Sequence, residues 1–365
     1  MLPGGLDICG LYIIGPLSDL NNFANQGKLK GILSSIHKIS SAQYFGTKES
    51  SSEKLILFGC TKSLKVGIKS VNLGESGSTF ASGDLKTQEN NWLQINYNYS
   101  LSCPMYFSSE KNLQSLRKSV MTYLQSWAQS LKNTIILIDG KCYEESDICW
   151  SPETNSSKTS KRKKGSSEIS VLKVVDAEIL ENLNNNESKG VSEIQDCYGS
   201  VLFSGHVAGR GYVIDKAPAS AYFDAVRNDL IRTMYSRWEM HCDSLIEEPH
   251  GSSTEPVLHE PPRRLFLKGK TSIISLCDYL FPGDSIKDAC QSAKELFDID
   301  IEEENIEDNL ENWADLNEFR KPETVSTFRD EEVFEDNISV VKRSNAFQFF
   351  FGGIAALLGY AYCVL

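Results

Sequence analysis

The chain has 365 residues, of which 24% are charged and 41% are hydrophobic, an ordinary balance for a globular protein. It carries 37 basic and 49 acidic residues, and its pI near 5.1 argues against a general nucleic-acid binder, which needs a basic face. The ten cysteines are scattered without a C-x-x-C pair, which argues against a disulfide scaffold. Those on apolar strands, Cys9 and Cys277, are predicted to be buried thiols in a reducing compartment.

The first part of the chain, 1–142, is predicted to fold as an α+β lobe. In chain order we expect strands at 6–14, 55–60, 64–73, 93–99 and 135–138, with helices over 18–39 and 111–132. The spacing of apolar residues distinguishes strands from helices in this part of the chain. Apolar and polar residues alternate in 93–99, as in a half-buried strand, whereas apolar residues recur at helical spacing in 111–132.

A polar segment, 143–167, is predicted to be a flexible loop, because its Ser, Lys and Glu residues bury too little surface to repay ordering. A second α+β lobe follows over 168–296. There we expect strands at 169–175, 199–206, 210–214, 265–267 and 272–278, a long helix starting near Pro218 and a last helix over 284–297. Gly205, Gly209 and Gly211 favour a hairpin turn. The similar order of elements suggests two related lobes or one large α+β unit.

The acidity of the chain is concentrated in one segment. Sixteen acids and three bases lie in 297–336, which leaves 33 acids against 34 bases in the rest. The predicted folded part is therefore nearly neutral. Like charges repel and extend a chain, so 297–343 is expected to be an acidic flexible spacer.

The last 20 residues, 346–365, contain no charge and one amide, Gln348. As a helix they are about 30 Å long, the thickness of the hydrocarbon core of a bilayer, and predict a single C-terminal transmembrane helix. Lys342 and Arg343 precede this segment and no charge follows it, so the bulk of the chain is expected to face the cytosol. The alternative, a buried core helix, would usually show a polar stripe.

Residues with catalytic chemistry are sparse. The five histidines form neither H-E-x-x-H nor H-x-H, so a structural role is predicted for those on helices and strands, and no cofactor or metal is expected. In the acidic spacer, Trp313 and Leu316 are three residues apart among acids, a W-x-x-L pattern that suits an extended peptide added to a sheet edge. Such motifs resemble those that bind ubiquitin-fold proteins in autophagy; the alternative is a plain spacer.

The opening run, LPGGLDICGLYII at 2–14, resembles the odorant response abnormal protein 4 family. The SLCDY strand at 275–279, the acidic spacer and the C-terminal apolar segment fit the same family. Members look as though they carry a further sheet-and-helix portion before the LPGG motif. The resemblance therefore implies that this copy is N-terminally truncated, with a hydrophobic sheet edge exposed.

The same segment is similar to the MPN fold of JAMM-type deubiquitinases and of the ubiquitin-fold-modifier protease, which implies a mixed sheet flanked by helices in 1–142. Active JAMM members carry two zinc-binding histidines in this run, and the matching positions here are Ile13 and Gly15, which offer no ligand. The downstream Ser and Asp of the motif fall on Ala24 and Gly27. The resemblance implies a degenerate, scaffold-type MPN-like domain.

Together these features predict a non-enzymatic, tail-anchored adaptor in the endoplasmic reticulum membrane. The family resemblance implies a role in folding, trafficking or localisation of multi-pass receptors such as G-protein-coupled receptors, and recruitment of the ubiquitin-fold-modifier protease. Two alternatives remain open: a membrane-anchored MPN-type isopeptidase, and an autophagy receptor acting through Trp313 and Leu316.

Overall fold

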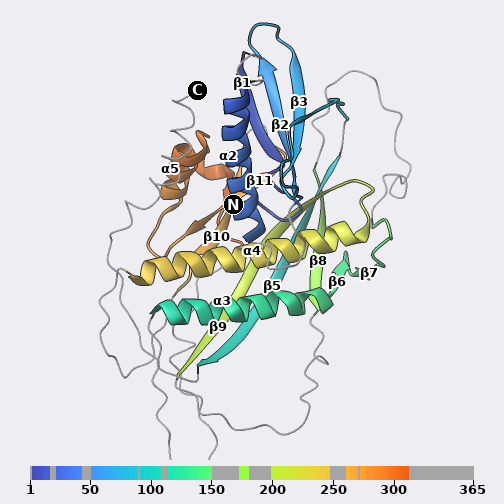
Figure 1. The fold of residues 1–365 in the computed structure, drawn as a ribbon. Coiled ribbons are helices and arrows are strands. Elements are labelled where there is room, and N and C mark those ends of the chain that lie inside the picture. Colours follow the sequence, from blue (N-terminus) through green and yellow to red (C-terminus); the bar gives the residue numbers. More distant parts are fainter. Residues whose placement is uncertain are drawn as a thin grey trace, which may run out of the picture.

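The computed structural model describes residues 2–16, 22–42, 51–88, 91–107, 113–149, 172–180, 199–246, 260–269 and 272–311. These residues form three β-sheets and four α-helices, in agreement with the α+β class that the sequence predicts (Figure 1). Among the helices so described, none combines the length and apolar character that a bilayer span requires. The predictions for 346–365, Lys342, Arg343, Trp313 and Leu316 fall outside the described residues.

The central sheet has five strands in the order β7-β6-β8-β5-β9. They are β5 (Trp92–Phe107), β6 (Ile135–Ile138), β7 (Lys141–Cys142), β8 (Lys173–Leu180) and β9 (Gly199–Ile214). β8 runs parallel to β5, and the other neighbours are antiparallel. Strands from before and after the 143–167 segment thus share one sheet, which favours one large α+β unit over two related lobes.

Two long helices cover one face of this sheet. α3 (Leu113–Ser130) and α4 (Ala219–Ile246) run side by side across β5 and β9 (Figure 1). α3 lies within the predicted 111–132, and α4 follows Pro218 as expected. The predicted alternation in β5 is confirmed on its apolar side, where Leu93, Ile95 and Tyr97 face the helices and are at most 3% exposed. On the other side Asn98 is exposed, but Gln94 is only 7% exposed and accepts a hydrogen bond of 3.1 Å from the Tyr212 hydroxyl, so both faces are covered at that end of the strand.

The glycines of β9 do not form the predicted turn, and the division into strands at 199–206 and 210–214 is wrong. β9 pairs with β5 without interruption from Gly199 to Ile214. A Cβ atom at Gly209 would lie 2.0 Å from Cζ of the Tyr97 ring, and one at Gly211 would lie 3.1 Å from Cβ of Ala225 on α4. The glycines therefore make room for a ring and a helix that pack directly against the strand.

A four-stranded sheet in the order β1-β2-β3-β4 carries helix α2 on one face. These elements are β1 (Gly10–Gly15), α2 (Phe23–Ala42), β2 (Glu53–Cys60), β3 (Val66–Asn72) and β4 (Ala81–Gly83). Leu29 and Leu33 of α2 pack on this sheet. On the opposite face Tyr12 and Ile14 are 64% and 62% exposed. The strand expected at 6–14 to be buried therefore begins only at Gly10, lies at a sheet edge and has one open face, and Cys9 just before it is exposed.

The third sheet, in the order β11-β10-β12, packs with helix α5. Its elements are β10 (Arg263–Lys268), β11 (Ser275–Leu280), α5 (Ile286–Phe297), the 3₁₀ turn η4 (Glu303–Asn305) and β12 (Ile306–Glu307). The structure thus differs from the predicted flexible spacer over 298–311, which carries η4 and β12 and ends at Glu311, a side chain only 2% exposed. The acids of this part are held by arginines, as described below. The rest of 297–343 lies outside the described residues.

Helix α5 begins with a capping box, which is expected to stabilise the folded protein. Asp288 accepts hydrogen bonds from the N–H and the hydroxyl of Ser285, at 2.7 and 2.8 Å, and these bonds lower the pKa of that carboxyl. The change Ser285→Ala is expected to lower the free energy of unfolding by about 1 kcal/mol, measured by urea denaturation. Lys287→Ala, an exposed position on the same turn, should stay within about 0.5 kcal/mol of wild type; equal losses at both positions would contradict the cap.

Candidate functional site

A carboxylate and a guanidinium form an ion pair completely removed from water. Asp229 lies on α4 and Arg264 on β10, and both side chains are 0% exposed. The two terminal nitrogens of Arg264 donate to the two carboxylate oxygens at 2.6 and 2.8 Å, a bidentate pair. Burial alone would lower the pKa of Arg264, but the adjacent carboxylate raises it, so this side chain stays charged. Such a pair is stable only when further hydrogen bonds satisfy the carboxylate.

Three further donors reach Asp229 from different parts of the chain. The Tyr97 hydroxyl donates to Oδ2 at 2.8 Å, the Arg210 N–H donates to the same oxygen at 3.2 Å, and the Gly4 N–H donates to Oδ1 at 2.9 Å. Burial, together with the Asp229 charge, raises the pKa of Tyr97, which therefore remains a hydrogen-bond donor. The carboxylate thus ties β5, β9, β10 and the LPGG motif to α4.

The LPGG motif lies between strand β9 and helix α4. Gly4 forms a parallel bridge to β9: its N–H donates to the Arg210 carbonyl at 3.0 Å, and its own carbonyl accepts the Tyr212 N–H at 2.9 Å. A Cβ at Gly4 would lie 1.9 Å from the Ala225 carbonyl oxygen, so no larger residue fits. This residue brings the chain backbone into direct contact with α4.

The second glycine of the motif turns the chain away from β9. Gly5 has φ +76°, and a Cβ there would lie 2.0 Å from the Tyr212 carbonyl oxygen. Just beyond it, the Leu6 carbonyl accepts a hydrogen bond of 2.9 Å from Arg232 of α4. The motif that carries the family resemblance is therefore, in this structure, a packing motif.

An acidic strap, defined here as residues 306–311, closes the opposite side of this network. Glu311 accepts three hydrogen bonds through its carboxylate: from the Ala208 N–H at 2.8 Å, from Arg237 at 2.6 Å and from the Arg264 N–H at 2.7 Å. Arg237 belongs to α4, Ala208 to β9 and Arg264 to β10. One side chain of the strap therefore joins three elements.

The other two acids of the strap each hold one arginine. Glu307 forms an ion pair with Arg210 of β9, whose guanidinium also lies 4.3 Å from the centre of the Phe266 ring. Asp308 accepts hydrogen bonds from Arg263 of β10, at 2.7 Å through its carbonyl and at 3.2 Å through its carboxylate. The strap thus matches an arginine with an acid at three places.

The degenerate zinc positions lie in the four-stranded sheet, outside this network. Ile13 lies on β1 opposite Phe58 of β2 and packs against the apolar core under α2, and Gly15 pairs with Cys60 where β1 ends. Gly27 lies on α2. Within the described ranges, no group of three or more His, Cys, Asp or Glu side chains is arranged to hold a metal ion. The structure brings neither Ile13 nor Gly15 to the Asp229 network.

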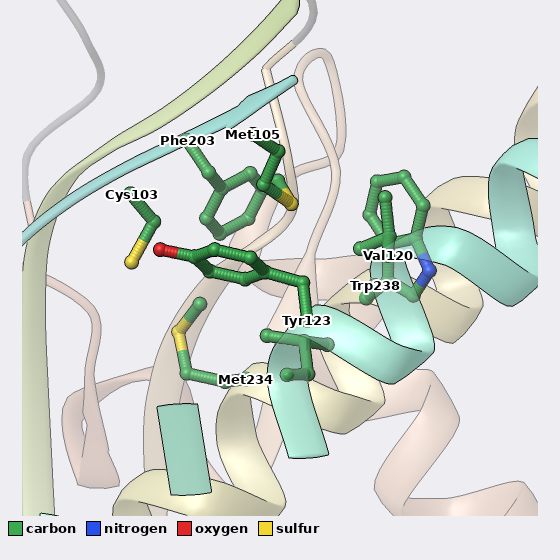
Figure 2. A pocket seen from close by; sticks show the side chains of 8 residues that line it. Cys103, Met105, Val120, Tyr123, Phe203, Met234 and Trp238 are labelled. Atoms are coloured by element: carbon green, nitrogen blue, oxygen red, sulfur yellow. The ribbon is translucent and has the colours of Figure 1, made fainter. Parts of the chain in front are cut away.

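An apolar cleft lies where α3 and α4 meet the ends of β5 and β9. Figure 2 shows its lining side chains, among them Cys103, Met105, Tyr123, Phe203, Met234 and Trp238. Its free space is only about 10 Å³, room for roughly one water-sized sphere, and its lining is almost entirely apolar. The cleft therefore has the character of a packing gap between helices and sheet.

Comparison with known proteins identifies relatives along most of the chain. The human "Protein odr-4 homolog" is 27% identical over 316 residues, covering 84% of this chain and 68% of that protein. The Drosophila melanogaster protein of the same name is 22% identical over 360 residues, covering 87% of this chain and 73% of that one. The Caenorhabditis elegans "Odorant response abnormal protein 4" is 26% identical over 141 residues, covering 38% and 29%.

A solved structure titled "Crystal structure of UfSP from C.elegans" matches 57% of this chain and 35% of its own, with 8% identity and a TM-score of 0.32. A likeness at that level supports no statement about a shared fold, so the MPN-like assignment stays a prediction. The family model described as "Odorant response abnormal 4-like" matches residues 1–308, a range that includes the LPGG motif, Asp229 and Arg264. This chain belongs to the odorant response abnormal 4-like family.

Proposed function

We propose that this chain is a non-enzymatic, tail-anchored adaptor of the endoplasmic reticulum membrane, with its folded part in the cytosol. It assists the folding, trafficking or localisation of multi-pass receptors such as G-protein-coupled receptors. The observation that carries the proposal is the family match over residues 1–308, because the family and its C. elegans member are named for a defect in the odorant response. Odorant responses depend on multi-pass receptors that reach the cell surface.

The arrangement of charged side chains supports a scaffold better than an enzyme. Asp229 and Arg264 are 0% exposed and form a bidentate pair, and Glu311 is 2% exposed and accepts three hydrogen bonds. Groups with these partners hold elements together and cannot reach a substrate. In this proposal the outer surface of the folded part recruits the ubiquitin-fold-modifier protease and receptor clients, an assignment that rests on the family resemblance.

In this proposal, residues 346–365 fix the protein to the membrane, and the segment before them sets how far the folded part extends from it. About 35 residues separate Glu311 from the apolar segment 346–365. As a flexible chain they span roughly 35 Å, and repulsion among their acids extends them further. A folded part tethered at this range meets membrane-bound clients at a high effective concentration without any new contact.

Deleting residues 346–365 tests the proposal directly. The deletion is expected to move the protein from the membrane pellet to the soluble fraction and to abolish co-purification of the ubiquitin-fold-modifier protease with membranes. The matched control is Gln348→Leu, which leaves the segment without its one amide and should keep the protein in the pellet.

Two results would contradict the proposal. Continued sedimentation of the deletion variant with membranes at high salt would contradict the anchor. Stoichiometric zinc in the purified protein, together with isopeptidase activity, would favour the MPN-type hydrolase over the adaptor.

A further inference from the structure

Three arginines from three different elements converge on the acidic strap. Arg210 of β9 and Arg237 of α4 are 5% and 6% exposed, and the Arg263 side chain of β10 is 18% exposed. Without residues 306–311, these three cations would lose Glu307, Glu311 and Asp308 as partners, respectively. We call the three arginines, with the backbone N–H groups of Ala208 and Arg264, the arginine cradle.

The strap contacts the cradle in the manner of an extended peptide added to a sheet. β12 pairs with β10 in antiparallel register, with Ile306 opposite Leu267 and Glu307 opposite Phe266. Ile306 is buried to 7% exposure in the small core under α5. Main-chain pairing provides affinity in this mode of recognition, and pockets for individual side chains provide specificity. Here the small core under α5 receives the aliphatic side chain of Ile306, and the three arginines pair with the three acidic side chains of the strap.

Apart from Ile306 and Glu311, which are buried, the strap has few contacts with the rest of the fold. Its β-ladder consists of two residue pairs, and the Glu307 and Asp308 side chains remain 44% and 30% exposed. Segments with short ladders and few apolar contacts open at lower free energy than the core of a domain. The bidentate contact between Asp229 and Arg264, in contrast, includes no side chain of the strap.

We propose that the arginine cradle is a binding site for acidic extended peptides, and that the strap is its resident, displaceable occupant. A partner fits if it carries an aliphatic residue followed by carboxylates in the spacing Ile-Glu-Asp-x-x-Glu that the chain itself shows at 306–311. The inference rests on this geometry alone and does not depend on the proposed role at the membrane.

The experiment uses the full chain, purified in detergent, with a protease recognition sequence inserted between Asp300 and Ile301. Cleavage leaves the strap held only by non-covalent contacts. The fragment is expected to remain bound and then to be released, in a dose-dependent manner, by a synthetic peptide of residues 301–311. The concentration of peptide needed for half-release should rise at least about 30-fold for the Glu311→Gln peptide, because this peptide cannot neutralise the buried Arg237.

The matched control peptide carries Glu304→Gln, which removes the same charge at an exposed position and should compete like the native peptide. Circular dichroism should show a folded chain after the strap leaves. The inference is overturned if the cleaved fragment resists a hundredfold excess of peptide, if both variant peptides compete equally, or if release of the fragment unfolds the chain.

Discussion

The change Asp229→Ala is expected to lower the free energy of unfolding by about 3–5 kcal/mol, because it leaves the Arg264 guanidinium buried without a counter-charge. It also removes the acceptor for Tyr97 and for the backbone of Gly4 and Arg210. The loss of stability is measured by urea denaturation, as a shift of the unfolding midpoint with an unchanged dependence of the free energy on urea concentration. The hydrogen-exchange protection of residues 2–6 should fall in the same variant.

Two comparisons isolate the ion pair as the cause. The double change Asp229→Leu with Arg264→Met replaces both charges by apolar groups and is expected to recover much of the lost stability. Asp300→Ala removes the acid of an exposed pair, 3.1 Å from Lys294, and should leave the urea midpoint close to that of wild type. If Asp229→Ala and Asp300→Ala cost the same, the buried pair does not hold the network together.

The change Gly4→Ala is expected to cost about 3 kcal/mol, near the upper end for overpacking. The new methyl group would lie 1.9 Å from the Ala225 carbonyl oxygen and 2.7 Å from Cβ of Asp229. One of these is a backbone atom of a helix, which cannot move aside as a flexible side chain does. The bridge from Gly4 to β9 would open, and its loss is measured by thermal unfolding and by hydrogen exchange.

A second glycine provides the matched control with the opposite sign. Gly27 lies inside α2, and a Cβ there would meet nothing within 4 Å. Gly27→Ala should therefore raise stability by about 0.5–1 kcal/mol, because alanine loses less conformational freedom in a helix. Destabilisation at Gly27 as large as that at Gly4 would show that close contact with α4 is not the reason.

The elements that could be predicted from sequence were those in which apolar residues recur at a regular spacing. The alternation around Leu93 and the helical spacing of 111–132 located β5 and α3, because a buried face repeats every two residues in strands and about every 3.6 in helices. The use of glycines to predict a turn was wrong in β9. Gly209 and Gly211 read as a turn, but they admit Tyr97 and α4 to the strand surface, and those contacts arise only from the assembled fold.

The buried charge network was missed, although α4 contains a signal for it. Ala225, Asp229, Thr233 and Arg237 recur every four residues, and all four are at most 6% exposed. A charged row beside an apolar row is usually taken for a solvated face. The role of this row depends on two distant partners: Arg264 lies 35 positions after Asp229, and Glu311 lies 74 positions after Arg237. No local sequence pattern shows that these residues come together.

The hydrogen bond from Gly4 to Asp229 joins residues 225 positions apart, and this separation constrains the order of events during synthesis. Ribosomes add about 5–20 residues per second, so the LPGG segment waits roughly 10–45 s before its acceptor exists. During that interval β1, which follows the motif, can already pair with β2, whereas Gly4 still lacks both β9 and α4 as partners. The LPGG motif is therefore expected to dock late during synthesis, after the sheet that contains β1 and β2 has formed.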